Sequence, residues 1–155
     1  MCLTRIVCRF ICLLGLSAIF VGCSTGSYNS GMNAAIAGES SAKLGVRYLL
    51  GRGVPQNDAT AFSYFLKGAN DGDPFAANEF AFMYAAGKGT SQDYSKAVYW
   101  YQQAANHDLA SAQFNLGLLY KYGLGVERNP SLAHQWISKA ASHGFEPARV
   151  ELAKS

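Results

Sequence analysis

Apolar and small residues recur along the body of the chain with a spacing that predicts paired helices. Between Ala112 and Tyr120 they stand at positions i, i+4, i+5 and i+8, which share one face of a helix with 3.6 residues per turn. A Gly-x-Gly turn follows at Gly123 and Gly125, and a second apolar stripe starts at Ala133. The stretch therefore predicts two helices joined by a glycine turn.

This pattern occurs three times, in steps of 36 residues and without insertion or deletion. The predicted units span 40–75, 76–111 and 112–147, and Ala148 and Leu152 continue the register into a truncated fourth unit, 148–155. The step links a tyrosine before each turn, a glycine in the turn and an aromatic residue after it: Tyr48, Tyr84 and Tyr120; Gly51, Gly87 and Gly123; Tyr64, Trp100 and Trp136.

One register position in each unit predicts where the second helix begins. It holds Asn57, Asp93 and Asn129, whose side chains are typical N-caps, and the second helices are expected at about 58–71, 94–107 and 130–143. A single helix pair cannot bury its apolar faces alone, so successive pairs are expected to stack. The sequence predicts an all-α fold for residues 38–155, a right-handed solenoid of antiparallel helix pairs.

The motif Ala-x-x-x-Leu-Gly-x-x-Tyr-x-x-Gly-x-Gly-Val, from Ala112 to Val126, resembles the Sel-one-like repeat (SLR), a member of the tetratricopeptide-like superfamily. The resemblance covers residues 40–152, with local departures at Gly68 and Thr90. The resemblance implies that the protein acts as a scaffold for protein complexes. Part of the family carries a disulfide pair in each repeat, which this chain lacks because its four cysteines all lie within the first 23 residues.

The N-terminus predicts an export signal that ends in a lipid anchor. Arg5 and Arg9 precede an uncharged apolar run, Phe10 to Val21, which is shorter than the roughly 20 residues that a membrane-spanning helix needs. The segment from Phe20 to Cys23 resembles the lipobox of bacterial lipoproteins. We expect a signal peptide at 1–22 and lipidation, including palmitate, at Cys23. A plain secretory signal is the alternative.

Residues 23–37 are expected to be a lipidated tether, because the stretch after Cys23 is rich in Gly, Ser and Asn. Acyl chains on Cys23 would anchor the protein stably, since each buried methylene contributes about 0.8 kcal/mol. Ser24 follows the cysteine and favours sorting to the outer membrane of a Gram-negative host. The predicted location is the cell envelope, on the outer membrane and facing the periplasm.

The charge of the mature chain argues against nucleic acid as a partner. Removal of residues 1–22 takes away Arg5 and Arg9, which leaves 11 of the 13 basic residues against 10 acidic ones. His107 and His143 share a register position near a helix C-terminus, where an imidazole suits the helix dipole better than it suggests a metal. We expect no enzyme activity, cofactor, metal or small-molecule substrate. An envelope enzyme, or a modulator of one, acting on peptidoglycan or β-lactams is the alternative.

The face of the first helices opposite the repeat motif is unusually apolar. In a curved solenoid this face lies on or near the concave side, where a peptide or helix of another envelope protein could bind. The residues expected to contact such a partner are Lys43, Val46, Leu50, Glu79, Phe82, Phe114, Asn115, Leu118 and Tyr122. The alternatives are packing between adjacent first helices, self-association through this face, or folding only on association.

Overall fold

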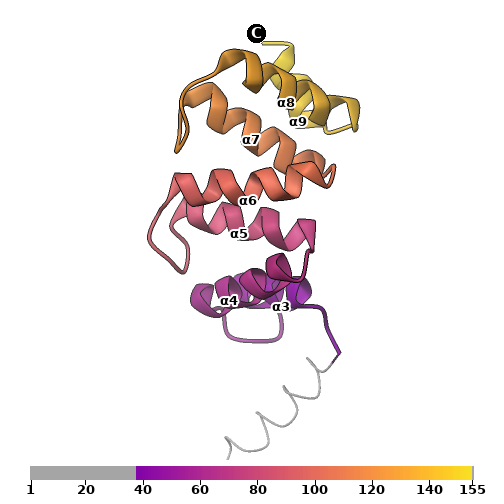
Figure 1. Cartoon of the computed structure of the whole chain (residues 1–155). Coiled ribbons are helices and arrows are strands. Elements are labelled where there is room, and N and C mark those ends of the chain that lie inside the picture. Colours follow the sequence, from indigo (N-terminus) through magenta and orange to yellow (C-terminus); the bar gives the residue numbers. More distant parts are fainter. Residues whose placement is uncertain (1–37, 155) are drawn as a thin grey trace, which may run out of the picture. The chain divides into compact units, whose positions relative to one another are not determined.

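The computed structural model describes residues 38–154, which form helices and turns and contain no strand. In this part of the chain α3 (Ser41–Leu50) pairs with α4 (Asp58–Asn70), α5 (Pro74–Ala86) with α6 (Tyr94–Asn106), and α7 (Ala110–Tyr122) with α8 (Pro130–Ser142). A short helix, α9 (Glu146–Leu152), follows. Figure 1 shows the helices stacked in chain order, which confirms the predicted all-α solenoid.

The predicted N-caps are present at all three second helices. The Asn57, Asp93 and Asn129 side chains each accept a hydrogen bond from the backbone amide three residues later, at 2.9, 3.0 and 3.0 Å. Such a cap typically contributes about 1 kcal/mol. Each second helix ends one residue before its predicted end, because Asp71, His107 and His143 are C-caps.

The glycine turns both end the first helices and join neighbouring units. Gly51, Gly87 and Gly123 have φ of 66°, 66° and 69°, a left-handed conformation that a residue with a Cβ adopts only at a cost. The second glycine of the turn packs on the preceding unit: a Cβ at Gly89 would lie 2.5 Å from the Asp58 carbonyl oxygen. The turn therefore has no room for another side chain.

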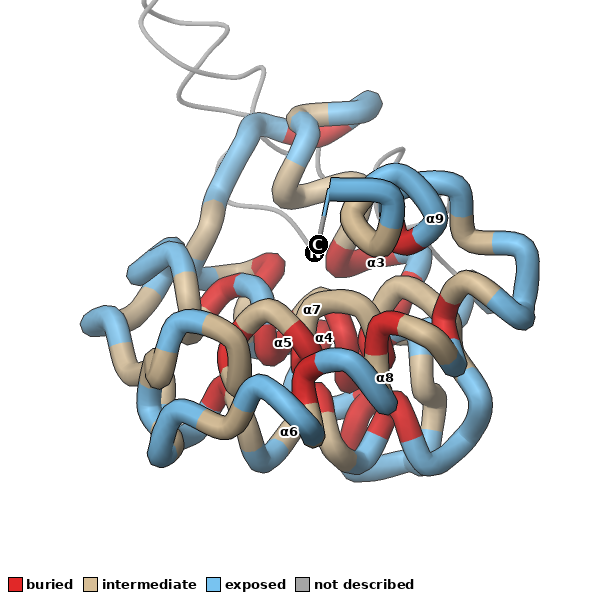
Figure 2. The backbone as a smooth tube through the Cα atoms, turned by 90° about the horizontal axis from the view of Figure 1, so that it is seen from above, coloured by how far each residue is buried: buried red, intermediate tan, exposed pale blue. Residues whose placement is uncertain are grey.

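The hydrophobic core runs between the first and second helices of successive units. Phe65, Phe80, Met83 and Leu116 are almost fully buried in the main cluster, among alanines that let the helices approach closely. A smaller cluster, Ile137, Ala140 and Ala148, binds α8 to α9. Figure 2 shows the buried stretches on the facing sides of the helices and the exposed stretches at the loops.

Predictions for residues 1–37 concern the part of the chain outside the described residues. These are the signal peptide at 1–22, the tether at 23–37 and lipidation of Cys23. Within residues 38–154, no helix has the length and apolar character needed to cross a membrane.

Candidate partner-binding surface

The nine residues expected to contact a partner lie on the first helices, and we call them the first-helix surface. The 36-residue step brings Lys43, Glu79 and Asn115 to equivalent places on α3, α5 and α7. A hydrogen bond joins two of these helices, since the Asn115 amide donates to Oδ1 of Asn78 at 3.4 Å. Adjacent first helices are therefore in direct contact, and their equivalent residues form rows along the solenoid.

Three apolar residues of the first-helix surface are exposed to solvent. The exposed fractions are 53% for Leu50, 40% for Phe82 and 60% for Tyr122. One such residue lies on each of the three complete first helices. Leu50 and Tyr122 are register equivalents, whereas Phe82 lies one helical turn earlier, at the position of Val46 and Leu118. Large exposed apolar side chains arranged in this way are typical of protein-binding surfaces.

The other three apolar residues of this surface are half-buried and hold the helices together. Val46 packs against the main core. Phe114 and Leu118 pack against the smaller cluster, and the Phe114 ring centre lies 5.4 Å from that of Phe145. The surface thus divides into exposed side chains available to a partner and half-buried side chains that pack within the fold.

Lysine side chains border two of the exposed aromatic rings. Nζ of Lys88 lies 5.7 Å from the Phe82 ring centre, and Nζ of Lys121 lies 5.8 Å from that of Tyr122. Lys43, on α3, is itself exposed and pairs with Glu39 at 3.4 Å. These cations form a polar border around apolar side chains, which is the usual composition of a protein interface.

Glu79 is the most unusual polar residue of the surface. Its carboxylate accepts a hydrogen bond from Nδ2 of Asn78 at 2.9 Å, and no basic side chain among residues 38–154 forms an ion pair with it. Burial raises the pKa of Glu79, and the bond from Asn78 partly opposes this shift. The Glu79 carboxylate can therefore accept a further hydrogen bond, and a partner can supply its donor.

The charge on Glu79 also influences the pKa of a buried tyrosine in the core. Tyr101 is 3% exposed, and burial, with a smaller contribution from Glu79, raises the pKa of its phenol. A buried phenol and a half-buried carboxylate place polar groups between α5 and α6. Glu79 was expected at this surface from its position alone, and the sequence did not predict its relationship with Tyr101.

A second polar contact that the sequence did not predict joins the second and third units. Gln113 is fully buried, and its amide donates to the Ala105 carbonyl at 3.2 Å. Nδ1 of His143 lies 3.1 Å from its side-chain oxygen. His107 and His143 are C-caps, as their helix-end positions suggested, and no metal-binding cluster of three His, Cys, Asp or Glu occurs in the described residues.

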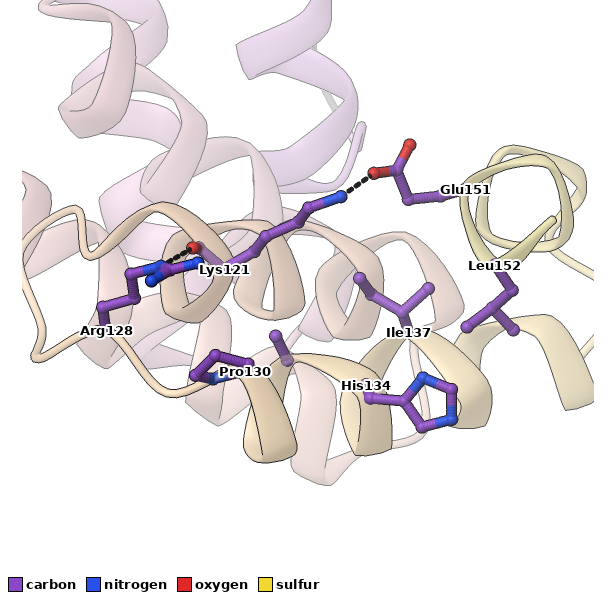
Figure 3. A pocket seen from close by; sticks show the side chains of 8 residues that line it. Lys121, Arg128, Pro130, His134, Ile137, Glu151 and Leu152 are labelled. Atoms are coloured by element: carbon purple, nitrogen blue, oxygen red, sulfur yellow. Dashed lines mark hydrogen bonds and ion pairs between the residues drawn. The ribbon is translucent and has the colours of Figure 1, made fainter. Parts of the chain in front are cut away.

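A cavity of about 190 Å³ lies where α8 meets α9. Lys121 extends across it to Glu151, while Pro130, His134 and Ile137 follow one another along α8 (Figure 3). Arg128 and Leu152 complete its walls together with Ala133. The structure also places His134 at this cavity.

Comparison with known families settles what kind of repeat this is. The Sel1 repeat matches residues 38–73, 74–109 and 110–145, which are three contiguous copies. The chain belongs to the Sel1 repeat family. These units begin two residues before those predicted from the sequence and have the same length. No curated protein matches the chain.

Solved Sel1-type structures share this architecture. A protective antigen of uropathogenic Escherichia coli with an SLR fold is 34% identical, with a TM-score of 0.71, over 81% of this chain and 26% of its own. A Sel1 repeat protein from Oxalobacter formigenes is 30% identical, with a TM-score of 0.71, over 79% of this chain and 53% of its own. The chain thus spans about a quarter and about half of these two proteins.

A third structure shows the fold alone. Helicobacter pylori cysteine rich protein B is 20% identical, with a TM-score of 0.64, over 82% of this chain and 96% of its own. Sel1 repeat proteins are generally scaffolds for protein interactions and are generally non-catalytic. The departure at Gly68 has a packing cause in this Sel1 chain, because a Cβ there would lie 2.6 Å from Cβ of Ala76.

Proposed function

We propose that this protein is a non-enzymatic adaptor of the bacterial envelope, anchored through lipidated Cys23 to the outer membrane, and that its first-helix surface holds a partner protein or peptide in the periplasm. The observation that carries the proposal is the recurrence of exposed Leu50, Phe82 and Tyr122 on successive first helices. One exposed apolar side chain on each unit suits an elongated partner that contacts all three units.

The polar residues of the surface support the same proposal. Glu79 is half-buried and has no ion-pair partner among residues 38–154, so a donor from the bound segment would compensate its lost hydration. Lys88 and Lys121, beside the exposed rings, would remain at the rim and affect the rate and salt dependence of binding more than its affinity.

In-cell crosslinking followed by identification of the captured protein, and then binding measurements with the purified pair, tests the adaptor role. Phe82→Ala and Tyr122→Ala should each weaken binding by about tenfold or more, as central aromatic contacts do. Tyr99→Ala is the matched control, because Tyr99 is 56% exposed but lies on a second helix. Equal affinities for all three variants would refute the assignment of this surface.

The anchor is tested separately with Cys23→Ser. Loss of acyl labelling and release of the protein from the membrane fraction are expected, because a single cysteine would carry the lipid. Unchanged labelling and membrane fractionation would show that Cys23 is not the anchoring residue. Density-gradient separation of the two membranes, performed on the unaltered chain, checks the proposed outer-membrane location.

A further inference from the structure

The junction between the second and third units is closed by a buried side-chain amide. Gln113, on α7, is fully buried, and its amide nitrogen donates to the Ala105 carbonyl at 3.2 Å and to Oδ1 of Asp108 at 3.4 Å. The amide oxygen lies 3.1 Å from Nδ1 of His143. Lys139 pairs with Asp108 at 2.8 Å. Both polar atoms of the Gln113 side chain are therefore bonded within the protein.

The equivalent place between the first and second units holds a cavity of about 250 Å³. Smaller or uncharged residues replace the three side chains that meet at the later junction: Ala77 for Gln113, Gly72 for Asp108 and Gln103 for Lys139. All three line the cavity, together with Ala69 and His107, the equivalents of Ala105 and His143. The cavity therefore arises from substitutions within the repeat, at a junction that has a complete unit on each side.

The groups that bond the Gln113 amide have counterparts at this cavity. The Ala69 carbonyl accepts a backbone hydrogen bond from Gly72 at 3.1 Å. The Ala105 carbonyl accepts the corresponding backbone bond and also the bond from Gln113, so a carbonyl in this position can take a second donor. The exposed imidazole of His107 forms no hydrogen bond or ion pair with residues 38–154. An acceptor and a potential donor thus face the same cavity.

We infer that this cavity binds the side-chain amide of a glutamine from a partner polypeptide. The amide nitrogen donates to the Ala69 carbonyl and the amide oxygen accepts from Nδ1 of His107, which repeats the bonds of Gln113. The walls include exposed Asn70 and Gln103, so a segment outside the fold can reach the cavity. An apolar side chain of the same size would leave the imidazole and the second site on the carbonyl without partners.

A blocked amino acid, N-acetyl-L-glutamine N-methylamide, is the probe. The corresponding leucine derivative is its control, because it has a similar size but no side-chain amide. Titrated into isotope-labelled full-length protein in detergent, the glutamine probe should shift the Trp100 indole and Gly72 amide signals saturably at millimolar concentration. The leucine derivative should bind at least about fivefold more weakly, because it forms neither side-chain hydrogen bond. The indole signal of Trp136, the equivalent of Trp100 at the closed junction, should not move.

Free L-glutamine distinguishes a free amino acid from a polypeptide as the source of the amide. Its ammonium and carboxylate groups resist removal from water, so it should bind more weakly than the blocked form. Tighter binding of the free amino acid would overturn the assignment to a polypeptide.

Two variants test the position and the chemistry of the site. Ala77→Gln supplies the first junction with the amide that Gln113 provides at the later one, so affinity for the glutamine probe should fall at least about tenfold. His107→Ala should weaken the glutamine probe severalfold and leave the leucine derivative unaffected. His134→Ala, at an exposed position on α8, should change neither.

Equal binding of the glutamine and leucine derivatives, or no shift at Trp100 and Gly72, would overturn the inference. Full affinity in a folded Ala77→Gln variant would do the same, and if that variant does not fold, unchanged affinity in His107→Ala decides against the site. The cavity is separate from the first-helix surface. Phe82→Ala should therefore leave the probe shifts unchanged, and failure here leaves the adaptor proposal intact.

Discussion

A Cβ placed on Gly125 would lie 2.5 Å from the carbonyl oxygen of Tyr94, so the turn of the third unit rests directly on the first residue of α6. Gly125 also has a φ of 68°, in the left-handed region. Two independent physical requirements therefore select glycine at this position, one from the backbone conformation and one from the neighbouring unit.

The two requirements can be separated by comparing Gly125→Ala with Gly144→Ala. Gly144 has a φ of 80°, but a Cβ added there would have no atom within 4 Å, so its substitution should cost only about 1–2 kcal/mol for the backbone strain. Gly125→Ala should cost about 1–3 kcal/mol more, because the turn must move away from α6. Urea unfolding measures both free energies, and equal costs would contradict direct packing of the turn.

Glu79→Gln should increase stability at neutral pH. Burial raises the pKa of Glu79 above 4.5, so the folded state binds a proton more readily than the unfolded state. The stability associated with that proton is present below pH 4.5 and is lost as the pH rises through the folded pKa. Glutamine keeps the acceptor for Asn78 without the charge, and its advantage in urea unfolding should shrink as the pH falls toward 4.5.

Glu151→Gln should have the opposite pH dependence. The hydrogen bond from Lys121 lowers the pKa of Glu151, so its contribution to stability is present above pH 4.5 and is lost as the pH falls through the folded pKa. The variant should be less stable at neutral pH and similar to the unaltered chain in acid. Amide exchange in α9 should quicken, because this ion pair joins α9 to α7.

Glu146→Gln is the control for the Glu151 experiment. Glu146 is also on α9 but is 71% exposed and pairs only with Arg149 of its own helix, at 3.4 Å. Surface pairs of this kind contribute little to stability. An equal effect of the two substitutions on α9 exchange would show that the link to α7 does not hold the helix in place.

Gln113→Leu should destabilise the junction between the second and third units by about 1–3 kcal/mol, the usual cost of leaving buried polar groups without a partner. The substitution removes the donor to the Ala105 carbonyl and the contact with His143. Thermal unfolding measures the loss. His143→Ala should reproduce only part of it, because the amide of Gln113 would still reach Ala105.

Most of this fold can be predicted from the repeat, because the residues that start and end each helix occur in three copies. The caps Asn57, Asp93 and Asn129 and the turn glycines each recur at a fixed step, so the sequence predicts helix starts and ends within one or two residues. Local chemistry decides these features. An N-cap or a left-handed glycine acts within its own turn, and tertiary contacts do not need to be known.

Residues that break the repeat could not be placed in the same way. Gln113 stands where the other units have Ser41, Ala77 and Arg149, so no second copy indicated what it contacts. Glu79 has an equivalent in Glu151, but Glu151 pairs with Lys121, and the equivalent of Lys121 in the first unit is Leu49. Exposure within the first-helix surface also escaped prediction, since Phe82 and Phe114 lie on the same predicted face yet only Phe114 has a ring, that of Phe145, packed against it. Such contacts depend on side chains from other elements, which periodicity does not reveal.

The helices of the described chain share most of their contacts with the helices next to them in sequence. Such a topology has low contact order, so folding closes only short loops and is expected to be fast. Deletion of residues 74–109 would join Asp73 to Ala110 at equivalent places in the repeat and preserve the type of junction. The solenoid can thus become longer or shorter by whole units, because each unit would still meet its neighbours through the same type of junction.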